Sequence, residues 1–442
     1  MYDVIVVGAR VAGAPTAMLL ARKGYKVLLV DKSTFPSDIL SSTLLIWPPG
    51  IALLQHWGVL EQLQATGCPP ITRYRAYLGA PFDRDPALII DGAPTPTPLE
   101  GISTSYAPRR TVLDKLLVDA AVAAGVTLYE GFTVDQVLLE EGRVVGIRGQ
   151  TQTGAPVTER ATLVIGADGV NSIVARTVAA AEYKTHDPIV LTYYAYWRDV
   201  ALADGVQVEF SPQDWCAAYA WPTHDGHLLL GTNWARALAE VPPQGAGFTP
   251  RSTDWSTAFA EVTQDVETSY MDILAQCAPW LADQCRSGGT RESPLAGGWV
   301  RSYYRKPFGP GWALVGDAGS SYEFTTAQGI MNAFREAQFL AEAVDDGLAG
   351  RRDLLESLAD YEQRRNAAEF PYSEFTIAAA TYQPVPDRAG AGALYAAIAQ
   401  NPEATAGFWG LFAQTVLPGE FFSEQHIRTL LQNKVGGESR GS

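Results

Sequence analysis

The sequence predicts an α/β protein in which a parallel-sheet domain stands beside a separate antiparallel sheet and a helical C-terminal segment. Three observations support this fold class. Residues 1–31 show the pattern strand, tight turn, helix, strand, which is typical of a parallel sheet covered on both faces. Residues 133–160 change to a period of two, and residues 188–234 contain four aromatic-rich strand candidates.

The composition indicates a folded chain of two or three domains, since a domain has about 150 residues. The chain has 442 residues, of which 47% are hydrophobic and 18% charged, and this excludes a disordered protein. Its net charge of -15 argues against a surface that binds nucleic acid or anionic lipid. No targeting segment is evident at the N-terminus and no window offers about 20 uninterrupted apolar residues, so we expect no membrane span.

The four cysteines are scattered and show neither a C-x-x-C spacing nor neighbouring histidines. They are Cys68, Cys216, Cys277 and Cys285. This pattern predicts neither a metal site nor a disulfide framework, and it favours a reducing, cytoplasmic location.

The first unit is expected to be a β-α-β arrangement. Val4–Val7 is a continuous β-branched run, Pro15 falls in the first turn of the following helix, and Gly24 fits the position just after that helix. Val27–Val30 is the second strand, and Asp31 ends it.

The later elements follow from periodicity and turn residues. We expect helices over 112–124 and 328–345, a mainly helical stretch beyond Pro371, and strands over 133–139, 144–148, 156–160, 161–165 and 312–315. The antiparallel sheet is expected to use strands over 189–197, 207–210, 216–221 and 227–233.

The turn after the first strand predicts a dinucleotide site. Gly8-Ala9-Arg10-Val11-Ala12-Gly13 has the outline G-x-G-x-x-G, with arginine in place of the middle glycine. Its helix N-terminus can hold a diphosphate, and Asp31, 18 residues beyond Gly13, with Lys32 beside it, suits an adenosine ribose of FAD or NAD(H). We favour a role for the Arg10 guanidinium in neutralising the diphosphate, over a side chain turned outward.

Two later motifs favour FAD. Gly166-Ala167-Asp168-Gly169-Val170-Asn171-Ser172 follows a buried strand, and Gly316-Asp317-Ala318 is followed by Thr326-Ala327-Gln328-Gly329-Ile330-Met331-Asn332. With the first turn, this order resembles the FAD-dependent aromatic hydroxylase-like monooxygenases, whose fold is that of p-hydroxybenzoate hydroxylase. The superfamily also includes geranylgeranyl-reductase-like enzymes and flavin halogenases.

The resemblance implies a Rossmann-like FAD-binding domain with an inserted β-meander, and it implies roles for several residues. Asp168 matches a motif that touches the flavin diphosphate and the nicotinamide cofactor, Arg110 faces the flavin chain, and the Val134 backbone meets adenine. Asp317 can accept hydrogen bonds from the ribityl hydroxyls, and the helix that begins at Gln328, Gly329, Ile330 and Met331 aims its positive end at the flavin. Alternatively, Asp168 only ends a strand, Asp317 only caps a helix, and Arg110 only faces solvent.

The sequence departs from the family's pattern G-D-A-x-H-x-x-x-P-x-x-G-Q-G at three positions. Ser320 stands at the histidine, Phe324 at the proline and Ala327 at the first later glycine. An aromatic side chain at 324 could stack on the flavin, narrow the pocket or block it.

The resemblance implies that NADH or NADPH reduces FAD, that O2 forms a flavin C4a-hydroperoxide, and that one oxygen atom enters an apolar or aromatic small molecule. Candidate substrate-pocket residues are Tyr193, Tyr219, Trp221 and Phe324. His186, His224 and His227 are expected in solvated loops, and no catalytic acid or base is singled out.

Three alternatives remain open: a reductase that acts without oxygen, a non-enzymatic FAD-binding protein, and electron supply by a separate flavin reductase. A halogenase is less favoured because the sequence lacks a W-x-W-x-I-P motif. We expect the FAD-binding domain to comprise 1–75, 100–182 and 300–370, the substrate-binding sheet domain 76–99 and 183–299, and a helical segment with a mobile tail 371–442.

Overall fold

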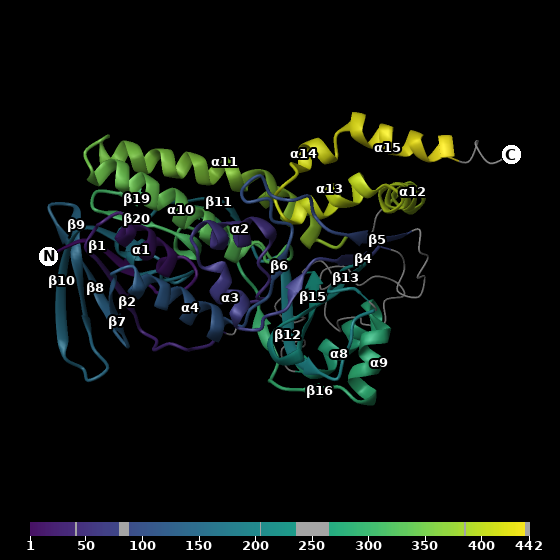
Figure 1. Ribbon diagram of the computed structural model, residues 1–442, viewed down its shortest axis with the longest axis horizontal. Helices are drawn as coiled ribbons and strands as arrows, with labels where there is room; N and C mark the ends of the chain where they lie inside the picture. The colour runs from purple at the N-terminus through teal and green to yellow at the C-terminus, as the bar shows by residue number, and fades with distance from the viewer. Residues whose placement is uncertain (40–41, 79–87, 204, 236–264, 384–385, 438–442) are drawn as a thin grey trace.

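The computed structural model describes residues 1–39, 42–78, 88–203, 205–235, 265–383 and 386–437. Two sheets lie side by side, with long helices above the first and shorter C-terminal helices above the second (Figure 1). Among the helices formed by the described residues, none has the length and apolar character that crossing a membrane requires.

The first sheet is the predicted parallel sheet. Its strand order is β19-β20-β10-β1-β2-β7, and all neighbours are parallel except β19 and β20. The strands are β1 (Tyr2–Val7), β2 (Val27–Asp31), β7 (Thr127–Glu130), β10 (Pro156–Gly166), β19 (Phe308–Gly309) and β20 (Trp312–Leu314). Val4, Ile5 and Val6 are fully buried, as a strand covered on both faces requires.

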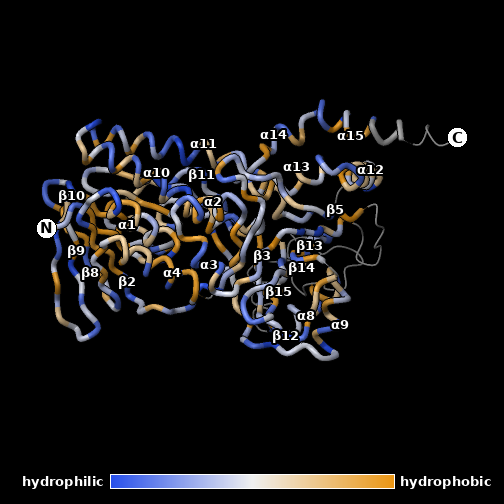
Figure 2. Tube along the Cα trace, in the orientation of Figure 1, coloured by the Kyte–Doolittle hydropathy of each residue, from blue (hydrophilic) through white to orange (hydrophobic). Residues whose placement is uncertain are grey.

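Helices cover one face of this sheet, and the β-meander covers the other. The helices are α1 (Gly13–Arg22), α2 (Pro48–His56), α3 (Leu60–Ala65), α4 (Arg110–Ala123), α10 (Gly329–Leu348) and α11 (Leu354–Ala380). The meander consists of β8 (Thr133–Glu140), β9 (Arg143–Gln150) and the first half of β10, with α5 (Ile173–Thr177) packed against it. Figure 2 shows apolar segments in the centre of this domain and a more polar α11 along its edge.

The two strands expected over 156–160 and 161–165 are one strand. Residues Pro156–Arg160 of β10 pair with β9, and Ala161–Gly166 pair in parallel with β1. Arg160 and Ala161 are consecutive, and neither is a residue type that favours a turn. The strand therefore continues from the meander into the parallel sheet without a break.

The second sheet carries the aromatic strands. Its order is β16-β12-β15-β14-β13-β4-β5, with β17 also paired to β12. Its strands are β4 (Tyr74–Tyr77), β5 (Ile89–Gly92), β12 (Val190–Arg198), β13 (Val208–Gln213), β14 (Cys216–Pro222), β15 (Leu228–Ala235), β16 (Thr290–Arg291) and β17 (Ala296–Gly298). The four long strands were predicted, within a few residues at their ends.

Each face of the second sheet packs against different elements. Helices α8 (Val266–Cys277) and α9 (Pro279–Ser287) cover one face. Residues 44–47 and the C-terminal helices cover the other. These helices are α12 (Arg388–Ala399), α13 (Pro402–Phe412), α14 (Pro418–Phe421) and α15 (Glu424–Gly437). The smaller elements are β3 (Pro70–Ile71), β6 (Ser105–Tyr106), β11 (Glu182–His186), β18 (Ser302–Arg305), β21 (Ser320–Ser321), η2 (His224–Gly226) and η3 (Gly316–Ala318).

The expected boundary at residue 371 falls inside a helix. Pro371 lies within α11, which runs unbroken from Leu354 to Ala380. A proline removes one backbone hydrogen bond, but the packing of α11 against α10 keeps the helix continuous. The last residues of the expected tail, 438–442, lie outside the described residues, as do 79–87 and 236–264 of the expected sheet domain.

Candidate cofactor and substrate site

The three predicted motifs meet at the carboxyl edge of the parallel sheet. Val7 is opposite both Val30 and Gly166, and Gly166 is opposite Leu314. Asp31, Gly8, Asp168 and Asp317 therefore follow adjacent strands in one row. Ligands of open parallel sheets bind at this edge, outside the carboxyl ends of the strands.

The glycines of the first turn are required by close backbone contacts. Gly8 has a φ of +102°, and a Cβ there would lie 2.3 Å from the carbonyl oxygen of Ala167. A Cβ on Gly13 would lie 1.8 Å from the Gly8 oxygen. A Cβ on Gly316 would lie 2.7 Å from the Cβ of Ala12, so the first and third motifs touch. Val11 is half-buried beside them.

The Asp31 side chain, at the end of β2, binds two backbone N–H groups. Its carboxylate is 8% exposed and accepts hydrogen bonds from the backbone N–H groups of Ala9 at 2.7 Å and Ser33 at 2.8 Å. It therefore joins the glycine turn to the segment where a ribose was predicted. Lys32 is exposed. Val134 lies half-buried on β8, just beyond Phe132, whose N–H donates to the Asp31 carbonyl at 2.8 Å.

Two arginines converge on one carboxylate beside the glycine turn. Asp114, on α4, is fully buried and pairs with Arg110 at 2.9 Å and with Arg10 at 2.5 Å. Arg10 also donates to the Ser37 hydroxyl at 3.0 Å. Arg110 is buried rather than facing solvent. One positive charge of this trio is left over, which favours an anionic ligand here.

Asp168 has a buried oxygen that is free to bind. Its Oδ2 accepts the backbone N–H of Ile173 at 2.7 Å, at the start of α5, while Oδ1 has no hydrogen-bond partner among the described residues. Burial raises the pKa of this carboxyl. The helix-end contact and the predicted cofactor contact use different oxygens, so both roles are compatible.

Asp317 lies in a turn whose neighbouring residues are bound by a buried glutamate. Its carboxyl is open to solvent but crowded by protein atoms, which, together with Glu336, raises its pKa to about 6. Glu336, on α10, accepts hydrogen bonds from the Gly316 N–H at 2.8 Å, the Ser320 hydroxyl at 2.5 Å and the Tyr361 hydroxyl at 3.1 Å. Ser320, at the family's histidine position, is thus a buried partner of Glu336.

The start of α10 is joined to the C-terminal helices. Gln328 is 1% exposed, and its side chain donates to the Phe412 carbonyl at the end of α13, at 2.9 Å. Gly329 is open, with no atom within 4 Å of a Cβ built there. Ile330 and Met331 are buried in the apolar core, so only their backbone is available to a ligand.

A narrow cavity lies between the second sheet and the loop that precedes α10. Its open space is about 30 Å³, roughly the volume of one water molecule in the liquid. Its lining residues are uncharged and half of them are aromatic; they are Thr43, Leu45, Trp47, Val208, Phe210, Tyr219, Trp221, Asn233, Phe324, Thr325, Thr326, Ala327, Trp409 and Phe412. Because residues 324–327 lead directly into α10, the cavity adjoins the predicted flavin end of the cofactor site.

Three of the four predicted pocket residues line this cavity. The ring of Tyr219 lies over Gly231, where a Cβ would come within 2.2 Å of it, and stacks on Trp221 at 5.0 Å. Phe324, at the family's proline position, narrows the space. Tyr193 lies on the opposite face, against Trp234, because alternate residues of a strand point to opposite faces.

Tryptophan N–H groups bind the two loops of the cavity. The indole N–H of Trp47 donates to the Thr326 carbonyl at 2.8 Å, and that of Trp221 donates to the Thr43 carbonyl at 2.9 Å. The walls are therefore fixed by hydrogen bonds, one of them buried and one partly buried, as well as by apolar packing. Sequence reasoning missed Trp47, Asn233, Trp409 and Phe412; the aromatic run 408–412 was a visible signal, but nothing local connects it to this cavity.

The expectation of solvated loop histidines was wrong for two of three. His224 is buried, its pKa is lowered by burial, and its ring bonds to the Thr66 hydroxyl at 2.9 Å. His227 is buried between Arg198 and Glu292. His186 is exposed, on β11. The two buried rings bond to protein groups and are not among the residues of the cavity.

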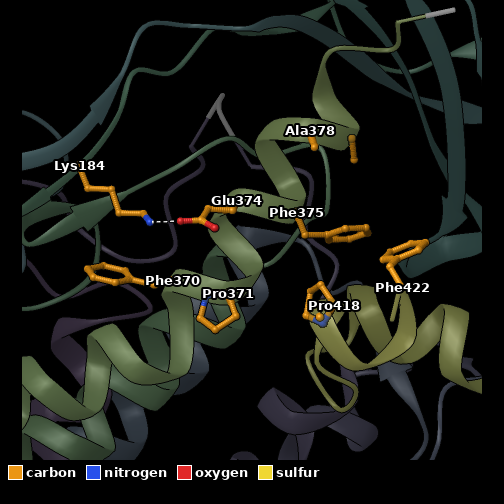
Figure 3. A pocket seen from close by; sticks show the side chains of 10 residues that line it. Lys184, Phe370, Pro371, Glu374, Phe375, Ala378, Pro418 and Phe422 are labelled. Atoms are coloured by element: carbon orange, nitrogen blue, oxygen red, sulfur yellow. Dashed lines mark hydrogen bonds and ion pairs between the residues drawn. The ribbon is translucent and has the colours of Figure 1, made fainter. Parts of the chain in front are cut away.

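A larger and more open groove lies elsewhere, between α11 and α14, with a volume of about 730 Å³. Figure 3 shows Lys184 and Glu374 paired at one end, and Phe375, Pro418 and Phe422 at the other. None of the predicted cofactor or pocket residues lines it. This groove therefore lies apart from the residues that the sequence predicts for the cofactor and the substrate.

The glycine cradle, the free oxygen of Asp168 and the surplus positive charge fit a dinucleotide along the edge of the sheet. A family model described as an FAD binding domain matches residues 1–369. The chain belongs to this family of FAD-dependent oxidoreductases, within the p-hydroxybenzoate hydroxylase-like superfamily.

Similar proteins carry out different reactions. A tryptophan 2-halogenase of Chondromyces crocatus is 24% identical over 369 residues, which cover 81% of this chain and 64% of the halogenase. A digeranylgeranylglycerophospholipid reductase 1 of Methanopyrus kandleri is 27% identical over 334 residues, covering 75% of this chain and 77% of the reductase. The structure of p-nitrophenol 4-monooxygenase PnpA of Pseudomonas putida has a TM-score of 0.71 at 15% identity, over 95% of this chain and 99% of that one. The chain thus spans less than two thirds of the halogenase.

Proposed function

We propose that the protein is an FAD-dependent monooxygenase that inserts one atom of O2 into an apolar or aromatic small molecule, with NADH or NADPH as reductant. The observation that carries this proposal is the aromatic-lined cavity, whose loop 324–327 runs directly into the helix expected to face the flavin. The balanced reaction consumes substrate, O2, NAD(P)H and a proton, and yields hydroxylated substrate, water and NAD(P)+.

The protein's own residues would bind, orient and shield. Arg10 and Arg110 would offset the charge of the diphosphate, Asp31 would accept hydrogen bonds from the ribose, and Asp317 would accept them from the ribityl chain. The N-terminus of α10 would stabilise negative charge at the flavin edge. FAD, when bound, supplies the redox chemistry with oxygen.

The cavity would exclude water from the reacting atoms. Trp47, Trp221 and Trp409 wall it, and α13 covers it, so the C-terminal segment closes the substrate site in this chain. A dry site protects reactive intermediates from hydrolysis and strengthens electrostatic interactions. The electron donor can be NAD(P)H bound transiently or a separate flavin reductase.

The reductase reading remains a second candidate. Phe324 favours it, because its ring occupies the family's proline position and narrows the cavity. The similarity to the digeranylgeranylglycerophospholipid reductase supports it as well.

Oxygen labelling separates the two. FAD-loaded protein is incubated with NAD(P)H, an aromatic panel and 18O2, and products are weighed by mass spectrometry. If the protein is a monooxygenase, the organic product gains one 18O atom per turnover, and turnover stops without O2. Turnover of a substrate under nitrogen, with no oxygen atom added to the product, would identify the reductase instead.

A further inference from the structure

We propose that Asn233 is the residue that selects the substrate, by accepting one hydrogen bond from an O–H or N–H group on an aromatic ring in the cavity. This rests on the proposed function, which places the substrate there. It narrows the substrate class to aromatic molecules that carry such a donor, for example phenols or N–H heteroaromatics.

Asn233 has a buried acceptor atom without a partner. It lies on β15, lines the cavity, and is 2% exposed. Its Nδ2 donates to the Tyr382 hydroxyl at 2.8 Å, and its Oδ1 has no hydrogen-bond partner in the described parts of the chain. A buried carbonyl left without a donor is costly, so a ligand that supplies one binds more tightly than one that does not.

The structure places the nitrogen end of the Asn233 amide against the Tyr382 hydroxyl, which leaves Oδ1 as the end without a partner among the described residues. Tyr382 is 8% exposed, and its backbone carbonyl accepts the Trp215 N–H at 2.6 Å, so the residue that receives Asn233 is itself held in place. A buried amide oriented in this way offers an acceptor to a ligand.

Among the described lining side chains, the Asn233 oxygen is an unused buried acceptor and the Trp409 indole N–H is an unused buried donor. The indole N–H groups of Trp47 and Trp221 already donate to backbone carbonyls, and the Tyr219 hydroxyl is bonded to Thr192 at 2.7 Å. The Thr326 hydroxyl is bonded to Thr376 at 2.8 Å. Each of these groups already has a hydrogen-bond partner in the protein, whereas the Oδ1 of Asn233 is a buried acceptor without one in the described part of the chain. A ring enters this narrow space only if side chains such as the half-buried Phe324 move.

The test compares ligands of equal shape. Indole and 1-benzofuran differ only in the N–H, and 2-naphthol and 2-methoxynaphthalene differ in the O–H donor. Affinities for FAD-loaded protein are measured by calorimetry at pH 8. We expect the donor of each pair to bind about tenfold more tightly.

Variants assign the preference to Asn233. Asn233→Leu should bring the ratio within each pair close to one, by weakening the donor ligand alone. Tyr382→Phe, which frees the amide to turn, should reduce the ratio several-fold and serves if the leucine variant fails to fold. Thr232 directly precedes Asn233 on β15, so its side chain points to the other face of the sheet. Thr232→Val removes only a buried hydroxyl there and should leave the ratio of affinities within each pair unchanged.

Three results would overturn the proposal: no preference in the unaltered protein, no binding of any of the four probes, or a preference that survives in both Asn233→Leu and Tyr382→Phe. Binding is measured without turnover. A protein that shows the expected preference but never consumes O2 therefore contradicts the proposed function and not the role of Asn233.

Discussion

Charge balance around Asp114 links single residues to cofactor binding. One fully buried carboxylate contacts two guanidinium groups, so the glycine turn faces a surplus positive charge. Arg10 is 21% exposed and sits at the position where most dinucleotide turns have glycine. Its hydrogen bonds to Asp114 and Ser37 hold the guanidinium beside the turn, where a diphosphate can reach it.

We predict that Arg10→Ala weakens FAD binding about tenfold and reduces the dependence of affinity on salt, because one partly buried charge pair with the diphosphate is lost. Fluorescence titration of the apoprotein with FAD measures both effects. Lys23→Ala, at the far end of α1, is the matched control and should leave the affinity unchanged. An unchanged affinity in Arg10→Ala would show that the side chain has no part in cofactor binding.

Glu323, which directly precedes the cavity loop 324–327, makes the stability of the fold depend on pH. It is 1% exposed, and burial raises its pKa from 4.5 to about 7. The unfolded chain therefore loses this proton at a lower pH than the folded chain. The contribution of Glu323 to stability falls as the pH rises from about 4.5 to about 7, by up to about 3 kcal/mol.

Glu323→Gln should remove this loss. Relative to the unaltered protein, the variant should gain about 2–3 kcal/mol of unfolding free energy between pH 5 and pH 8. Urea unfolding at the two pH values measures the difference. An equal effect of the substitution at both pH values would mean that Glu323 titrates normally in the folded protein.

At the scale of elements, the contact between β1 and α1 depends on a missing side chain. A Cβ on Gly13 would overlap the backbone oxygen of Gly8, which cannot move aside like a flexible side chain. Gly24, just beyond α1, has a φ of +92° but nothing within 4 Å of a Cβ. A substitution at Gly13 therefore tests steric overlap, and one at Gly24 tests backbone strain alone.

We expect Gly13→Ala to lower the unfolding free energy by at least about 3 kcal/mol and to abolish FAD binding, since the turn must open to admit the methyl group. Gly24→Ala should cost about 1 kcal/mol and bind FAD normally. Denaturant unfolding and FAD titration of both variants test this. Equal losses in the two variants would contradict the steric account.

Much of this element-level structure was predictable, because the signals are local. The apolar run of β1, the glycine turn and Asp31 lie within residues 1–31, and the apolar end of β10 directly precedes its own motif. The sheet brings the three motifs to one edge. Tyr193 was misplaced because a shift of one residue moves a strand side chain to the opposite face. The i, i+4 spacing of Arg110 and Asp114 on a helix is a signal for an ion pair, but the sequence analysis did not predict this pair.

At the scale of the whole molecule, the cavity is a product of distant segments. Loop 43–47, strands β13–β15, loop 324–327 and helix α13 each supply walls, and they are separated by up to several hundred residues. Sequence patterns predict the elements but not which faces meet, so Trp409 and Phe412 could not be assigned to the site. The same geometry explains why the C-terminal helices cover the cavity.

Because the cofactor is expected to touch β1, β2, β10, η3 and α10, FAD should stabilise the folded chain as a unit. At a free FAD concentration 100 times the dissociation constant, we expect the unfolding free energy to rise by about 2.7 kcal/mol. Thermal unfolding with and without FAD measures this, and AMP serves as a control ligand. A transition that FAD does not shift would exclude binding specific to the folded state.

The most direct test of the account is a crystal structure of the protein grown with FAD. The account predicts one FAD per chain, with the diphosphate at Gly8–Gly13 and the flavin ring between the start of α10 and the cavity beside Phe324 and Asn233. Density showing the flavin ring away from that cavity, or another nucleotide at the glycine turn with FAD excluded, would contradict it.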